Sequence, residues 1–296
     1  MVGERRGGLP RGGHLVGEGV RHPHHGHRPR RAGPAAEAPP VKLDVASLKA
    51  ALVDVLPDPL VYRIAPLIYR GQEPELARLR SFVPRGRNAV DVGGWLGPWT
   101  RELSRWCGRV DTFEPQPDLA AFLRKVVPAN VTVHEVAVSD AAGRTRLVVP
   151  SSRHGENALA SVRPGAADAD PDAIVHEVDV VRLDDLGFTD VGFLKVDVEG
   201  HEREVLDGAT ALIGRDRPRI LLEAEQRHLD TPLHELFDHV GALGYRGWFL
   251  HGGGWHALDT FDVEQRQTAH LDDLTGPDYV NNFLFVPTED EFTPTT

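Results

Sequence analysis

Charged side chains follow directly on an apolar segment near the middle of the chain. Residues 194–202 read LKVDVEGHE, so three carboxylates and a histidine lie within nine positions. Carboxylates and imidazoles hold ligands and move protons, and buried segments rarely carry so much charge without a partner or a function. We therefore interpret Asp197, Glu199 and His201 as candidate catalytic residues. The alternative is the start of a solvated helix, where acidic residues are also favoured.

The pattern around this segment predicts where these groups lie in the fold. Residues 193–198 have the apolar character of a short buried strand, and Glu202, Val205, Leu206 and Ala209 then recur at helical spacing. The candidate residues therefore lie at a strand-to-helix junction, near the carboxyl end of a strand. In open α/β sheets, ligands bind at that edge.

A second junction of the same kind lies upstream, where residues 88–97 read NAVDVGGWLG. Gly93, Gly94 and Gly97 allow a ligand to approach the backbone, and the following helix start offers free N–H donors. The arrangement is D-x-G-x-x-x-G, and the dinucleotide fingerprint G-x-G-x-x-G would need a glycine at Val92.

A third element, residues 109–115, is a short apolar strand that ends at Glu114. Glu114 lies 17 residues after Gly97, close to the offset of about 20 residues at which a carboxylate binds a ribose diol. A helix-capping acid is the alternative interpretation. Together, the two junctions predict a cofactor that contains a nucleoside.

The motifs D-V-G-G-W-L-G-P-W-T, F-E-P and L-K-V-D-V-E-G-H-E-x-x-V-L-x-G-A occur in this order. In order and spacing they resemble the FkbM family of S-adenosylmethionine-dependent methyltransferases, over about residues 73–287. The resemblance implies a class I, Rossmann-like α/β fold with a seven-stranded sheet, mostly parallel with a reversed last strand, and helices on both faces. Trp95 stands at the middle glycine of the general methyltransferase pattern D-x-G-x-G-x-G.

The resemblance also implies a cofactor, a reaction and a set of site residues. The cofactor is S-adenosyl-L-methionine, and the expected binding residues are Asp91, Gly93, Gly94, Gly97, Thr100, Glu114, Pro115, Ala137 and Asp197. The expected reaction is O-methylation of a hydroxyl on a small molecule such as a sugar or a natural product. Two alternatives stay open: methylation of nitrogen or of a glycan or protein acceptor, and a non-catalytic module that only binds the cofactor.

Methyl transfer from a sulfonium depends mainly on orientation of the acceptor, but a hydroxyl acceptor also benefits from a general base. His201 has the most suitable intrinsic pKa, although it could equally be a surface histidine. A metal ion is a second hypothesis, because strands ending at Asp197 and at Glu223 and Glu225 should be neighbours. Three such carboxylates suit Mg²⁺. The alternative is that the glutamates only form hydrogen bonds at the sheet edge.

The rest of the pattern divides the chain into regions. Residues 1–40 form an Arg/His/Gly/Pro-rich tail that we expect to be disordered. Residues 41–85 predict a helical cap, which either covers the active site or serves as scaffold. The methyltransferase domain spans residues 86–288, with a lid-like insertion at about 150–173 as the candidate acceptor-binding element. Residues 289–296 are a C-terminal tail.

Within the domain, helices and strands alternate as in α/β proteins. We expect helices at 60–69, 74–82, 119–126 and 233–243 and strands at 131–138, 144–149, 174–181 and 219–225, followed by an antiparallel pair at 245–250 and 283–286.

Charge and composition limit the partners. The net charge is −11, and because the first 40 residues carry seven Arg against three Glu, the remainder carries −15. Such a surface repels phosphate backbones, so we expect no nucleic-acid partner. The single Cys107 excludes a disulfide framework, and no segment is long and apolar enough for a membrane span or a secretory signal. We expect a cytoplasmic protein, and a homo-oligomer is left open.

Overall fold

The computed structural model describes residues 56–149, 173–292 and 294. Its α-helices are α2 (Asp58–Tyr69), α3 (Pro74–Phe82), α4 (Pro98–Ser104), α5 (Pro117–Val126), α7 (Glu202–Asp207), α8 (Thr210–Asp216), α9 (Leu233–Ala242) and α10 (Val263–Arg266). Its strands are β1 (Asn88–Val92), β2 (Val110–Phe113), β3 (Val131–His134), β4 (Ala137–Val138), β5 (Gly143–Val149), β6 (Ile174–Val181), β7 (Val191–Val196), β8 (Arg219–Glu223), β9 (Tyr245–His251), β10 (Gly254–Ala257) and β11 (Asn282–Pro287). The predicted tail at 1–40, the first part of the cap and nearly all of the lid-like insertion lie outside the described residues.

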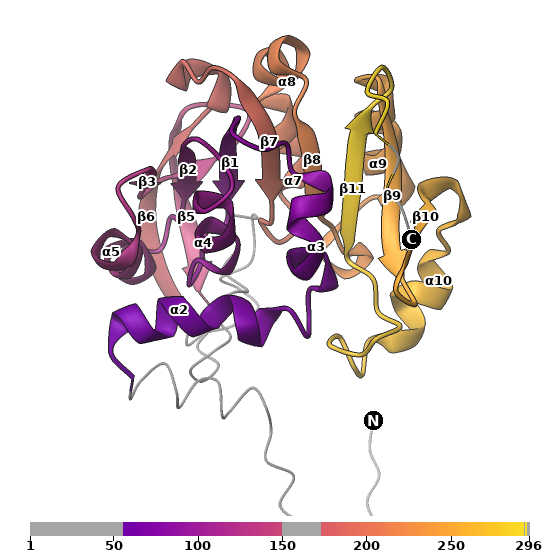
Figure 1. Cartoon of the computed structure of the whole chain (residues 1–296), viewed down its shortest axis with the longest axis horizontal. Coiled ribbons are helices and arrows are strands. Elements are labelled where there is room, and N and C mark those ends of the chain that lie inside the picture. The colour runs from indigo at the N-terminus through magenta and orange to yellow at the C-terminus, as the bar shows by residue number, and fades with distance from the viewer. Residues whose placement is uncertain (1–55, 150–172, 293, 295–296) are drawn as a thin grey trace, which may run out of the picture. The chain divides into compact units, whose positions relative to one another are not determined.

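The main sheet has eight strands in the order β10-β9-β11-β8-β7-β1-β2-β3 (Figure 1). Strands β3, β2, β1, β7 and β8 run parallel, and β11 is antiparallel to both β8 and β9. This arrangement confirms the expected mostly parallel sheet with a reversed last strand. The eighth strand was not predicted: β10 pairs with β9 through a tight turn at Gly252 and Gly253, both of which have positive φ.

A second, three-stranded sheet has the order β4-β6-β5. It contains the two extra strands expected at 144–149 and 174–181. The prediction of one strand at 131–138 is wrong, because this stretch divides between the two sheets. His134 is the last residue of β3 paired with β2, whereas Ala137 pairs with Val180 of β6. Alternating apolar residues fit either sheet equally well, so the pattern alone did not reveal the division.

Helices cover both faces of the main sheet, because alternate side chains of its strands point to opposite sides. On β1, Ala89 belongs to a hydrophobic cluster that includes residues of α3 and α4, and the next residue, Val90, belongs to a second cluster that includes residues of α7, α8 and α9. All six residues of β7 are buried, as expected for a central parallel strand. The carboxyl end of this strand is therefore held rigidly from both sides.

The helices predicted at 60–69 and 74–82 are present as α2 and α3, and each has proline in its first turn. Helix α2 packs on α4 and α5, and α3 contributes Leu76, Leu79 and Phe82 to the core beside α4. The turn between α2 and α3 consequently lies next to the carboxyl ends of the central strands (Figure 1).

Candidate functional site

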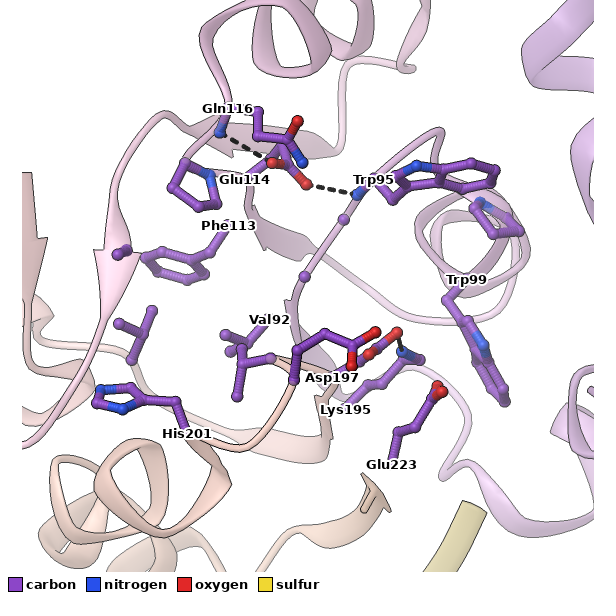
Figure 2. A pocket seen from close by; sticks show the side chains of 18 of the residues that line it. Val92, Trp95, Trp99, Phe113, Glu114, Gln116, Lys195, Asp197, His201 and Glu223 are labelled. Carbon is purple, nitrogen blue, oxygen red and sulfur yellow. Dashed lines mark hydrogen bonds and ion pairs between the residues drawn. The ribbon is translucent and has the colours of Figure 1, made fainter. Parts of the chain in front are cut away.

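A pocket lies at the carboxyl ends of β1, β2 and β7, where α/β sheets bind ligands (Figure 2). The turn between α2 and α3 and the loop from β1 to α4 form one side of it, and β4 and β5 contribute to the opposite side. Of the predicted site residues, those that line the pocket are Gly93, Gly94, Glu114, Pro115, Ala137, Asp197, Glu199, His201 and Glu223.

The glycines after β1 are required by the packing of neighbouring backbone. Gly93 has φ +88°, and a Cβ at this position would lie 2.0 Å from the carbonyl oxygen of Asp197. The Asp197 N–H in turn donates to the Val92 carbonyl at 3.0 Å. A Cβ on Gly94 would lie 2.5 Å from Thr112 Oγ1. The loop therefore fixes the ends of β1, β2 and β7 close together, and both glycines also border the pocket.

Three predicted cofactor residues lie beneath this loop and do not line the pocket. Asp91 is completely buried, and its carboxylate accepts a hydrogen bond from Thr100 Oγ1 at 2.6 Å. Burial raises the pKa of Asp91 to about 6. Gly97 has φ +77° and packs against the ring of Tyr62. In this structure Asp91, Thr100 and Gly97 position the loop and the start of α4.

Glu114 follows β2 and presents its carboxylate to the pocket (Figure 2). Oε2 accepts the backbone N–H of Trp95 at 2.7 Å, and Oε1 accepts that of Gln116 at 2.9 Å. Burial raises the pKa of Glu114 to about 7. Each carboxylate oxygen can accept a second hydrogen bond, so the group is fixed in position and can still bind a pair of vicinal hydroxyls.

The pocket wall beside Glu114 is apolar. Its residues are Phe113, Pro115, Val136, Ala137, Val138 and Leu147. A carboxylate beside an apolar wall fits a nucleoside, with the ribose at Glu114 and the base against the wall.

The other half of the pocket is strongly acidic. We call Glu73, Lys195, Asp197 and Glu223 the acidic floor. Lys195 is 1% exposed, and its Nζ lies 2.8 Å from Asp197 Oδ2. Burial alone would lower the pKa of Lys195, but Asp197, Glu73 and Glu223 together hold it above its ordinary value. Burial, and then the charge of Asp197, raises the pKa of Glu223 well above its usual range.

Lys195 and Glu73 were not predicted as site residues. A signal for Lys195 was present in the sequence, because a lysine two positions before Asp197 on a buried strand shares its face. Glu73 gave no such signal. It lies in the turn between two helices, more than 100 residues before Asp197, and only the packing of α2 and α3 brings it to the floor.

His201 precedes α7 and lines the pocket, but it lies apart from Asp197 and Lys195 in Figure 2. Its Nε2 is 2.9 Å from Ser139 Oγ, and its Nδ1 is 3.5 Å from a Glu204 carboxylate oxygen. Burial lowers the pKa of His201, which favours the neutral ring at pH 7. The imidazole is thus in a suitable state for a base, although both nitrogens already have neighbours.

Glu199 lines the pocket and pairs with a histidine that does not line it. Glu199 adopts a left-handed backbone conformation with φ +53°, and its carboxylate lies 2.6 Å from Nε2 of His228. The turn is also held by Glu202, whose Oε1 accepts the N–H of Gly200 at 2.7 Å. This geometry suits a residue that shapes the turn between β7 and α7.

The structure does not bring the three predicted metal ligands together. Glu225 turns away from the pocket, where both of its oxygens accept hydrogen bonds from Arg227, at 2.6 and 3.0 Å, and the Tyr279 hydroxyl also donates to it. Among the described residues, the set with ligand atoms within 4.8 Å of one another is Glu199, Glu225 and His228, without Asp197 or Glu223.

Comparison with known families assigns this fold. The sequence profile of the methyltransferase FkbM domain matches residues 86–246, which include the loop after β1, Glu114 and the acidic residues after β7. The chain therefore belongs to the FkbM family of S-adenosylmethionine-dependent class I methyltransferases. No curated protein matches the sequence.

Three solved structures illustrate the similarity of this chain to known proteins. An FkbM methyltransferase from Methylobacillus flagellatus KT shares 16% identity, with a TM-score of 0.44 over 81% of this chain. The chain spans only 57% of that protein. A mutant of MtNAS in complex with S-adenosylmethionine shares 17% identity over 82% of this chain and 72% of its own, with a TM-score of 0.43. Precorrin-6y C5,15-methyltransferase from Geobacter metallireducens GS-15 shares 15% identity over 73% and 87%, with a TM-score of 0.37.

None of the helices in the described parts of the chain has both the length and the apolarity needed to cross a bilayer.

Proposed function

We propose that this protein transfers the methyl group of S-adenosylmethionine to a hydroxyl oxygen of a small molecule of the sugar or natural-product type. The observation that supports this proposal is one pocket with two different halves. Glu114 and an apolar wall form one half, and the acidic floor forms the other. The first suits a nucleoside, and the second suits a polar acceptor rich in hydrogen-bond donors.

In this proposal, different residues would hold different parts of the cofactor. The cofactor supplies an electrophilic methyl group on a positively charged sulfur. Glu114 would hold the ribose diol, the loop at Gly93 and Gly94 would border the rest of the cofactor, and Asp197 would bind its ammonium group. Because in-line transfer depends chiefly on orientation, the rigid ends of β1 and β7 would provide much of the catalysis.

A hydroxyl acceptor also has to lose its proton. Glu223 is a candidate base, because its carboxylate borders the pocket and burial raises its pKa, which makes it a stronger proton acceptor than an exposed carboxylate. Its Oε1 accepts a hydrogen bond from Asn281 Nδ2 at 2.7 Å, which fixes the carboxylate. His201, in its neutral state, is the alternative base. In either case the transfer would use protein side chains and no divalent metal.

The test is a transfer assay with the full chain, methyl-labelled S-adenosylmethionine and a panel of sugars, polyols and phenols, with amines and peptides for comparison. We expect S-adenosylhomocysteine to form together with an O-methyl product, identified by its NMR shift. A methyl group found only on nitrogen, or on a protein or glycan acceptor, would contradict the O-methylation of small molecules. A protein that binds the cofactor without transfer to any acceptor would support a binding module.

A further inference from the structure

The three carboxylates of the acidic floor come from three different elements, and each is fixed by one donor of the protein. These donors are Trp99 Nε1 for Glu73, Lys195 Nζ for Asp197 and Asn281 Nδ2 for Glu223. Because the carboxylates are held before any ligand arrives, a ligand that matches them loses little free energy to reorganisation. A carboxylate only accepts hydrogen bonds, so the matching ligand has to present several O–H or N–H donors.

Acidic side chains outnumber basic ones in the pocket lining. Among the described residues that line it, five have a carboxylate, and Lys195 is the one lysine or arginine. Glu114 belongs to the ribose position and Glu199 pairs with His228, which leaves three carboxylates around Lys195. S-adenosylmethionine carries one net positive charge. With the cofactor bound, the floor therefore still has about one uncompensated negative charge when its carboxylates are ionised.

Aromatic side chains also line the pocket. Tyr69 and Trp95 form an edge-to-face pair with ring centroids 4.9 Å apart, and Trp99 lies 5.8 Å from Lys195 Nζ. Trp95 has φ +43°, a conformation that costs a non-glycine residue roughly 1 kcal/mol or more. Such strain at a pocket residue argues for a use of the indole ring. Aromatic faces bind cations and the C–H faces of saturated rings.

We propose that the acceptor is a hydroxylated ring that carries a protonated amine, of the amino sugar or aminocyclitol class. Its ammonium group would bind between Glu73 and Glu223, its hydroxyls would donate to the remaining carboxylate oxygens, and its ring would pack on Trp95. This inference rests on the proposed methyl transfer to a hydroxyl and specifies which hydroxyl compounds the site selects.

To bind an ammonium group, the floor carboxyls with raised pKa values would have to lose their protons. Burial, followed by the charges of neighbouring carboxylates, raises the pKa of Glu223, and burial likewise raises that of Glu73. An ammonium group between them would lower both values. Binding of an amine should therefore release protons from the floor, and binding of a neutral diol should not.

The experiment compares two small ring probes that differ in one group, trans-2-aminocyclohexanol and trans-1,2-cyclohexanediol. Their dissociation constants are measured by ligand-observed NMR on the full chain saturated with S-adenosylmethionine. We expect the amine to bind about tenfold tighter or more at pH 7, because each unscreened charge contact in a partly buried site has at least this effect. Glu73→Gln and Glu223→Gln should each reduce this preference, while Glu264→Gln, at an exposed position on α10, should not. Raising the pH above the pKa of the amine probe should abolish its preference over the diol.

The outcomes separate the two proposals. Equal affinity for both probes, or binding of neither probe to the saturated protein, overturns the amine-bearing acceptor and leaves O-methylation intact. Methylation of glucose and glucosamine at equal rates would likewise overturn the amine-bearing acceptor and leave O-methylation intact. Transfer of the methyl group only to nitrogen contradicts the proposed O-methylation, whatever the preference between the probes.

Discussion

At the scale of single residues, the charge of the pocket depends on Lys195. Its ammonium is buried on β7 and lies 2.8 Å from Asp197, within the field of Glu73 and Glu223. Since an ammonium without a partner is strongly disfavoured at such a position, the lysine and the carboxylates require one another.

Replacement of this lysine tests that dependence. Lys195→Met should lower the free energy of unfolding by roughly 3 kcal/mol or more near pH 8, since breaking a buried pair leaves uncompensated charge. The loss should be smaller at pH 5. The floor carboxyls have raised pKa values in the folded state, so the stability that they contribute is present at low pH and lost as the pH rises.

Urea denaturation at both pH values measures this effect. Lys125→Met, at an exposed surface pair with Asp58, is the control and should change stability by about 1 kcal/mol or less. An equal loss for Lys195→Met at both pH values would contradict the account.

A second prediction at this scale concerns divalent metal. Because Glu225 is engaged by Arg227 and Tyr279, the three predicted ligands do not converge. We expect that dialysis against a chelator leaves cofactor affinity and the rate of methyl transfer unchanged within about twofold. Loss of activity that Mg²⁺ alone restores would instead require these side chains to rearrange around an ion.

At the scale of elements, the contact between the ends of β1 and β7 positions the site. Gly93→Ala would place a methyl group 2.0 Å from the Asp197 carbonyl oxygen and would also force a side chain onto a positive φ. We expect a loss of about 3 kcal/mol or more in stability, together with weaker cofactor binding. Gly214→Ala in α8 is the matched control. Its Cβ meets no atom within 4 Å, so it should be neutral or stabilising by up to about 1 kcal/mol in thermal unfolding. Two variants of equal stability would contradict this account of the loop.

Sequence patterns predicted the strands, the helices and the junctions between them best. Both strand-to-helix junctions are local, because the apolar strand, the glycines and the acids lie within about ten residues of each other. The antiparallel pair at β9 and β11 was also predicted. The division of 131–138 between two sheets was not, because strand pairing depends on partners far along the chain.

At the scale of the whole molecule, the pocket is assembled from distant segments. Tyr69 and Glu73 come from the region predicted only as a helical cap, and Asn281 comes from the residue before β11. Their roles depend on the packing of α2 against α4 and α5 and on the reversed strand beside β8. Contacts of this kind leave no periodic signal in one sequence. The residues around Glu114 could therefore be predicted as site residues, whereas Glu73 and Lys195 of the acidic floor were not.

We propose that this pocket binds S-adenosylmethionine through Glu114. The most direct measurement is calorimetric titration of the full chain with S-adenosylmethionine, S-adenosylhomocysteine and NAD. We predict saturable binding of both sulfur nucleosides and none of NAD. Glu114→Gln should weaken that binding about 10- to 100-fold, as expected for the loss of charged hydrogen bonds, and Glu264→Gln should not. A folded protein that binds neither nucleoside, or a Glu114→Gln variant with unchanged affinity, would contradict the account.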